Sequence, residues 1–117
     1  MTGRGLIVVY RWSVEPHAVG SFEAQWRALT DRLRPLGGLG SCLTRTAAGE
    51  FVALAAWPDR ETRIAAFAAL EAQPAIPGVE RRSAEELEVA ADLWCSSPFG
   101  QTRAPGLPDG QAAGDTA

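Results

Sequence analysis

Two short segments of this chain carry apolar side chains on both faces of an extended backbone. Residues 6–14 (LIVVYRWSV) and 50–57 (EFVALAAW) are rich in β-branched and aromatic residues, which favour strands. Alternate side chains of a strand point to opposite faces, so each segment presents an apolar row on either side. A sheet with one face in water would show polar residues at every second position. Both faces of these strands are therefore expected to be covered.

Two amphipathic segments supply helices for one of these faces. In the first, apolar residues recur at helical spacing and form one stripe: Phe22, Trp26, Leu29 and Leu33. Pro16 marks its start, and Pro35 with the glycines that follow marks its end. The second helix is expected to begin at Asp59, whose side chain suits an N-cap, and to continue to about residue 72.

Two further strands complete the predicted sheet. Residues 39–46 (LGSCLTRT) form a hairpin with residues 50–57 through a turn at Ala48–Gly49. Residues 80–86 are expected to form a short helical turn, and residues 87–95 (LEVAADLWC), which fit either a helix or a strand, are interpreted as a strand from their alternation. The order β-α-β-β-α-β predicts an α+β, ferredoxin-like fold. Its antiparallel sheet has strand order 4-1-3-2, with both helices on one face.

The helices leave the second face of this sheet uncovered. An apolar sheet face needs a partner, and a second copy of the same chain is the simplest one. A homodimer is therefore predicted. Arg11 points to this face, and we expect it to pair with a carboxylate of the other copy, because a buried charge requires a partner.

The 117 residues suit one domain, which we place at residues 1–95. From Ser96 onward the chain is rich in Gly, Pro and Ala, so residues 96–117 are expected to be a mobile tail. The N-terminal apolar run is too short for a signal peptide or a membrane span. No membrane association is expected.

Charge and cysteine usage exclude other classes. The formal net charge is -3, and the basic residues are scattered arginines, so nucleic acid is not an expected partner. Cys42 and Cys95 fall on predicted strands at opposite edges of the sheet, too far apart for a disulfide. With a single histidine and no CxxC spacing, no zinc site is expected. Reduced thiols fit a cytoplasmic protein.

Five stretches resemble the antibiotic biosynthesis monooxygenase (ABM) domain of the dimeric α/β-barrel superfamily: YRWSVEP, SFEAQWRALTDRLR, GGLGSCLTR, EFVALAAWPDRET and LEVAADLW. The resemblance covers residues 6–95 and is most specific at Trp57, which ends a strand before the second helix, and at the YRW of the first strand. It implies two ferredoxin-like sheets packed face to face. It also implies small oxygenases that use neither metal nor flavin, so no cofactor is expected.

Other relatives implied by this resemblance degrade heme with an asparagine, a tryptophan and a histidine. Trp57 matches the tryptophan by its context. The chain contains no asparagine, and its only histidine, His17, precedes the first helix instead of lying on the second. Heme degradation by that set of residues is not expected.

Eight residues are candidates for the site. Trp57 fits the wall of a pocket, and equally an aromatic plug between the sheet and the second helix. His17 is a candidate general base, because histidine titrates near neutral pH, and Arg45 is a candidate for binding an anionic phenolate or carboxylate. His17 and Arg45 could instead be surface residues that have no role in a site. The candidate substrate-binding residues, which could instead fill the core, are Tyr10, Trp12, Trp26, Phe51 and Phe67.

The resemblance to ABM domains, together with these candidate residues, implies cofactor-independent oxygenation of a small aromatic quinol, anthrone or polyketide-like molecule. Two alternatives remain open, namely a cyclase or isomerase that uses the same pocket, and a non-catalytic dimeric binding protein. A titratable group that faces a cavity would favour an enzyme. A cavity filled by Trp26, Phe67 and Leu70 would favour the binding protein.

Overall fold

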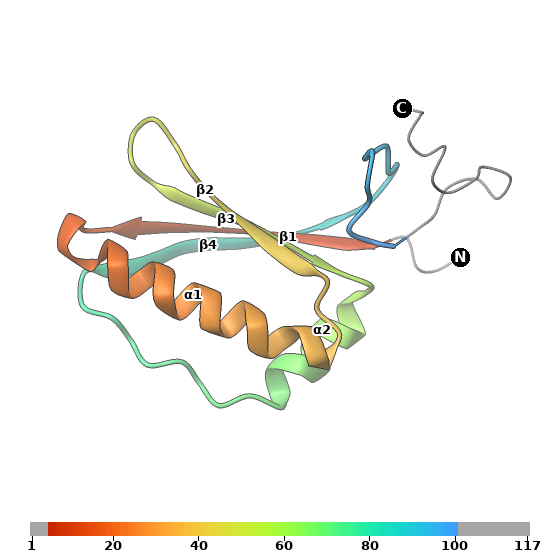
Figure 1. Ribbon diagram of the computed structural model, residues 1–117, viewed down its shortest axis with the longest axis horizontal. Coiled ribbons are helices and arrows are strands. Elements are labelled where there is room, and N and C mark those ends of the chain that lie inside the picture. Colours follow the sequence, from red (N-terminus) through yellow and green to blue (C-terminus); the bar gives the residue numbers. More distant parts are fainter. Residues whose placement is uncertain (1–4, 101–117) are drawn as a thin grey trace, which may run out of the picture.

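A computed structural model describes residues 5–100 and shows one four-stranded antiparallel sheet with both helices on the same face (Figure 1). The elements follow in the order β1 (Leu6–Val14), η1 (Pro16–Ala18), α1 (Val19–Leu33), η2 (Arg34–Leu36), β2 (Gly40–Arg45), β3 (Phe51–Trp57), α2 (Arg60–Ala68) and β4 (Val79–Glu88). The sheet order is β2-β3-β1-β4. The α+β, ferredoxin-like fold and its strand order are thus confirmed. Neither α1 nor α2 is long and apolar enough to cross a membrane.

The two faces of the central strand β1 lie in different environments. Its register with β3 places Leu6 opposite Trp57 and Trp12 opposite Phe51, on the side of the sheet that carries the helices. Val8 on this side is fully buried, and it packs in one core cluster with Leu6 and Trp57. This cluster joins the sheet to α2.

The opposite side of the sheet, here called the open face, carries no helix (Figure 1). Its residues on the two central strands are Ile7, Val9 and Arg11 of β1 with Val52, Leu54 and Ala56 of β3. Val9 and Ala56 are buried by their neighbours, whereas Leu54 and Leu87 of β4 are exposed. Arg11, expected to need a partner here, is exposed in the single chain.

Both helices have ends that the sequence explains. The side chain of Asp59 accepts a hydrogen bond from the backbone N–H of Thr62 at 2.7 Å, so the predicted N-cap of α2 is confirmed. The helix ends at Ala68, earlier than the predicted residue 72, and the chain then runs through Pro74 and Pro77 to β4. After α1, Gly37 has φ 109° and a side chain there would collide with Thr62.

The prediction for the last strand was wrong in its position. Residues 80–86 are part of β4, not a helical turn, and residues 89–95 lie outside any strand. β4 pairs with β1 from Val14 to Leu6, so it ends where β1 begins. Its charged sequence, VERRSAEELE, contains many helix formers, but hydrogen bonding to β1 decides its structure, and an edge strand tolerates charges well.

Residues 89–100 leave the sheet beside the start of β1, on the side away from the helices (Figure 1). Phe99 packs against Gly5, where a Cβ atom would lie 2.6 Å from its ring. Cys42 and Cys95 are free and exposed, as expected, although Cys95 follows β4 instead of lying on it. Residues 101–117 of the expected tail lie outside the described residues.

Candidate functional site

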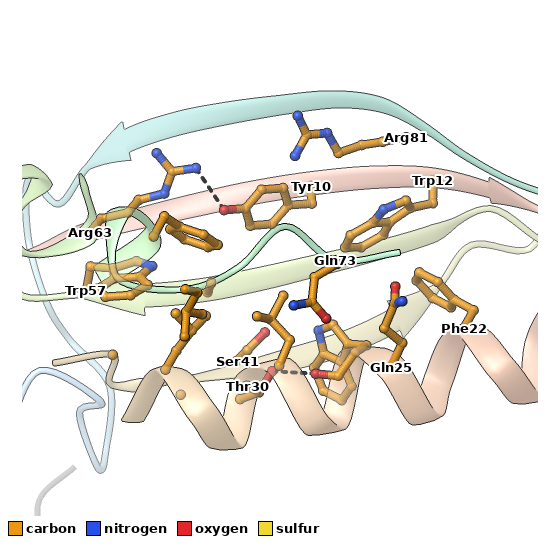
Figure 2. Close-up of a pocket in the computed structure, with 18 of the residues that line it drawn as sticks. Tyr10, Trp12, Phe22, Gln25, Thr30, Ser41, Trp57, Arg63, Gln73 and Arg81 are labelled. Carbon is orange, nitrogen blue, oxygen red and sulfur yellow. Dashed lines mark hydrogen bonds between the residues drawn. The ribbon is translucent and has the colours of Figure 1, made fainter. Parts of the chain in front are cut away.

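A cavity of about 400 Å³ lies between α1, the helix-bearing side of the sheet, and the segment that connects α2 to β4 (Figure 2). Its volume is within the range of small-ligand sites. Gln73 of the connecting segment lines it, and the side chain of Gln25 on α1 donates a hydrogen bond to the carbonyl oxygen of Pro74 at 2.9 Å. This bond holds the connecting segment against α1 and closes one side of the cavity.

Aromatic side chains make up much of the wall and form two contacting groups. In the first, Tyr10 stacks on Trp12 with ring centroids 5.7 Å apart, and Trp12 meets the edge of Phe22 at 4.9 Å. In the second group, the ring centroids of Trp57 and Phe67 are 6.0 Å apart. Figure 2 shows Trp57 and Phe22 at opposite ends of the cavity. The groups do not form a single stack, but both border the same space.

Trp57 is both a core residue and a wall of the cavity. It is 2% exposed and packs with Leu6, Val8 and Ala66, and one part of its surface borders the cavity. The sequence could not separate these two interpretations, and both hold. Trp94, by contrast, follows β4 and is 60% exposed.

A chain of polar contacts links α2 to β1 and β4 at one wall of the cavity. Nη2 of Arg63 donates to the hydroxyl oxygen of Tyr10 at 2.8 Å, and Nη1 donates to Oε2 of Glu86 at 3.0 Å. The other carboxylate oxygen of Glu86 accepts from Nε of Arg60 at 2.8 Å, and this contact raises the pKa of Arg60. Three side chains thus fix the position of the Tyr10 hydroxyl.

This arrangement leaves the hydroxyl of Tyr10, a residue that lines the cavity, able to act as a hydrogen-bond donor. Its oxygen is the acceptor in the contact with Arg63, so the hydroxyl hydrogen points elsewhere. Within residues 5–100 the hydroxyl has no acceptor. A substrate oxygen in the cavity is a suitable acceptor, and the adjacent guanidinium would favour negative charge on that oxygen.

A second arginine, Arg81, lines the cavity from the edge strand β4. It lies opposite Trp12 in the register of the sheet, and its guanidinium carbon is 5.8 Å from the centroid of the Tyr10 ring. Glu71 is the one carboxylate among the lining residues that the structure describes. Among residues 5–100, no group of three or more His, Cys, Asp or Glu side chains is placed to hold a metal ion.

Five of the eight candidate residues line the cavity: Tyr10, Trp12, Trp26, Trp57 and Phe67. Together with Leu70, the side chains of Trp26 and Phe67 border an open space and do not fill it. The other three candidates lie elsewhere. Phe51 is 3% exposed and packs beneath Phe22, so it supports the wall without reaching the cavity.

The two polar candidates that lie elsewhere are His17 and Arg45. His17 is on the exposed turn η1, with its side chain 66% exposed, 3.8 Å from a carboxylate oxygen of Glu15 and packed near Gly78. Arg45 ends the edge strand β2, and its guanidinium lies over Phe51 at 4.7 Å. Neither side chain lines the cavity.

Sequence reasoning missed the two arginines that replace them in the site. Arg63 precedes Phe67 by four residues, so helical spacing places both on one face of α2 and is a usable signal. Arg81 lies in a segment interpreted as a helical turn. Only its pairing with Trp12 reveals that it lies on the helix-bearing side of the sheet.

A four-stranded antiparallel sheet with two helices and an aromatic cavity on one face defines a small, ferredoxin-like protein with an internal ligand-sized site. No protein-family model matches the chain, and no curated protein matches it significantly. Solved structures do match.

A mutant of SnoaB, a cofactor-independent oxygenase from Streptomyces nogalater, aligns at 18% identity and TM-score 0.61, covering 77% of this chain and 97% of that one. A heme-degrading protein from Mycobacterium tuberculosis, in a heme-free crystal, aligns at 20% identity and TM-score 0.58, covering 77% of this chain and 99% of that one. A third protein, Rv0793 from Mycobacterium tuberculosis, aligns at 19% identity and TM-score 0.53, covering 75% of this chain and 97% of that one. At these identities the likeness shows a shared fold.

Proposed function

We propose that this chain is an ABM-type oxygenase that oxidises a small electron-rich aromatic, a quinol or anthrone, with O₂ and without a cofactor. The observation that carries the proposal is the aromatic cavity of about 400 Å³ into which Arg63 presents the hydroxyl of Tyr10. The shared fold with a cofactor-independent oxygenase supports it. The cavity has the size and planar walls that a molecule of two or three fused rings requires.

The proposed chemistry uses the substrate itself as the reductant. Loss of a proton from an anthrone gives a delocalised anion that transfers electrons to O₂ and forms a carbon–peroxide bond. The proton that the anthrone lost returns to the peroxide, and loss of water from the resulting hydroperoxide leaves a carbonyl, so one oxygen atom enters the product and the other leaves as water. The Tyr10 hydroxyl would donate to the substrate oxygen that carries the negative charge. The aromatic wall would exclude water from the reactive anion.

The lining residues favour such a substrate over heme. Proteins hold heme iron through histidine, cysteine, methionine or tyrosine. Among the described residues that line the cavity, only Tyr10 belongs to this set, and its hydroxyl is already bonded to Arg63. His17 lies outside the cavity.

We also propose that two copies pack through the open face, as the dimeric α/β barrel requires. The apolar row of Ile7, Val9 and Leu54 on the central strands supports this, as does the exposure of Leu54 and Leu87. A second copy would cover these side chains and give the exposed Arg11 a site for pairing with a carboxylate.

Oxygen uptake by the purified, metal-stripped protein tests the proposed reaction, with a panel of anthrones and naphthohydroquinones as substrates. Uptake well above the spontaneous rate, with one atom of ¹⁸O from ¹⁸O₂ in the product, is the expected result. Conversion of a substrate without oxygen uptake would replace the proposal with a cyclase or isomerase. Binding of the panel compounds without any conversion would indicate a binding protein.

A further inference from the structure

We propose that the substrate of this cavity is an aromatic acid, a planar molecule whose anionic oxygen substituent binds the guanidinium of Arg81. The inference rests on the proposed function of the cavity as a substrate site, and it adds the chemical class of the substrate. A carboxylate or a phenolate has the required charge, and both are planar with the ring that carries them.

Arg81 is placed to bind such a group. It lines the cavity, and it is exposed on the edge strand β4. Figure 2 shows α1 on the far side of the cavity from β4, with Arg63 and Arg81 on either side of Tyr10. Both guanidinium carbons are 5.8 Å from the centroid of the Tyr10 ring. A ligand that lies along the Tyr10–Trp12 stack would place a substituent between these two cations.

The guanidinium of Arg81 is available, whereas both Nη atoms of Arg63 are already hydrogen-bonded. Arg63 bonds both Tyr10 and Glu86, and Glu86 also bonds Arg60. Within residues 5–100, Arg81 has no carboxylate within 4.0 Å, and Glu71 in the lining forms no ion pair with it. A guanidinium has five N–H donors in a planar fork that fits a carboxylate. Arg81 therefore offers an unused anion-binding group beside a surface suited to an aromatic ring.

The arrangement also separates recognition from reaction. Arg81 would hold the anionic substituent at the open side of the cavity, and the hydroxyl of Tyr10 would contact the reacting part of the molecule farther inside. Trp57 and Phe67 would then enclose the apolar end of the ligand. A neutral molecule of the same shape would have the apolar contacts without the charge-assisted hydrogen bonds.

Calorimetric titration with 2-naphthoate and 2-naphthamide tests this inference, because the two probes have nearly the same shape and differ in charge. We expect the wild-type chain to bind the acid about tenfold more tightly than the amide, as a charge-assisted hydrogen bond implies. Arg81→Gln should abolish this preference, mainly by weakening the binding of the acid.

The adjacent Arg82 provides a matched control. It is paired with Glu80 at 3.5 Å and does not line the cavity, so Arg82→Gln changes the net charge equally and should retain the preference. Binding inside the cavity should shift the indole N–H signals of Trp12, Trp26 and Trp57 in the NMR spectrum. The signal of Trp94, outside the cavity, should not move.

Equal affinity of the wild-type chain for both probes would overturn the inference. The same holds for binding of neither probe, or for an equal loss of preference in Arg82→Gln. The titration is independent of oxygen uptake. A preference for the acid without oxygenation would support the proposed substrate class and contradict the proposed reaction. Oxygenation without the preference would support the reaction and contradict the substrate class.

Discussion

The hydroxyl oxygen of Tyr10 on β1 lies 2.8 Å from Nη2 of Arg63 on α2, across one wall of the aromatic cavity. The contact joins the central strand of the sheet to a helix that the sequence places more than fifty residues later. It also leaves the hydroxyl hydrogen free to be donated into the cavity. The chemistry proposed for the site depends on this pair, and each partner can be tested separately.

Tyr10→Phe removes the donor and keeps the ring that stacks on Trp12. With a substrate that the wild-type chain oxidises, we expect the rate of oxygen uptake to fall about 100-fold, the usual loss when one donor to a developing oxyanion is removed. Initial rates in an oxygen electrode measure this. Trp94→Phe, which alters an exposed ring outside the cavity, should retain the wild-type rate. An undiminished rate in Tyr10→Phe would exclude the hydroxyl from the reaction.

Glu86→Gln tests how Arg63 is held. The side chains of Arg63 and Glu86 are only 21% and 26% exposed, so their ion pair is partly shielded from water. We expect the substitution to lower the free energy of unfolding by about 1–2 kcal/mol, as for a hydrogen bond to a charged group. Urea denaturation measures the change. Glu23→Gln, on α1 and outside this network, should cost much less, and an equal loss in both variants would contradict the assigned role.

Trp57→Ala should destabilise the chain strongly, because Trp57 is 2% exposed and belongs to the core cluster. The expected loss is about 3–5 kcal/mol, the range for removing a large buried side chain. Trp57→Phe keeps much of the packing and should lose less, so it is the variant to use in activity assays. Trp94→Ala should leave the urea midpoint almost unchanged. A small loss in Trp57→Ala would mean that Trp57 is a cavity wall without a core role.

Patterns within single segments predicted most of the fold. The β-branched and aromatic residues of β1, the apolar stripe of α1 and the cap at Asp59 each act locally, and all three are where the sequence indicated. β4 was misplaced because its charged sequence favours a helix in isolation. Its actual structure depends on pairing with β1, and no local pattern in β4 records that pairing.

The site was predictable to the extent that it is aromatic. Alternation along β1 placed Tyr10 and Trp12 on the same face, and both line the cavity. In the charged part, only Arg63 was predictable, because helical spacing places it on one face of α2 with Phe67. Arg81 was not, because it reaches Tyr10 from β4, which the sequence placed wrongly. His17 and Arg45 became candidates through their residue types. Whether such side chains line the cavity depends on the tertiary structure, which the residue type does not record.

Asp59→Asn tests the cap of α2 through its pH dependence. The hydrogen bond from Thr62 lowers the pKa of the Asp59 carboxyl below its usual 3.8. A carboxyl with a lowered folded-state pKa contributes stability that is present above the unfolded value and is lost as the pH falls through the folded value. The difference in urea midpoint between wild type and Asp59→Asn should therefore shrink below about pH 4. A difference that stays constant from pH 6 to pH 3 would contradict this.

Leu54→Asp tests the proposed pairing of two chains. Leu54 lies at the centre of the open face, beside Val9, and is 38% exposed in the single chain. A carboxylate there would be buried without a partner in the dimer, so the dimer should dissociate. We expect sedimentation of the wild-type chain at micromolar concentration to give twice the 12.4 kDa of one chain, and Leu54→Asp to give a monomer.

Ile64→Asp is the matched control, because Ile64 is 57% exposed on α2, on the opposite side of the sheet. This variant should remain dimeric. A wild-type monomer at the same concentration would show that the exposed apolar residues of the open face have no partner copy. In that case the proposed dimer would be wrong, and the oxygenase proposal would rest on the cavity that one chain forms by itself.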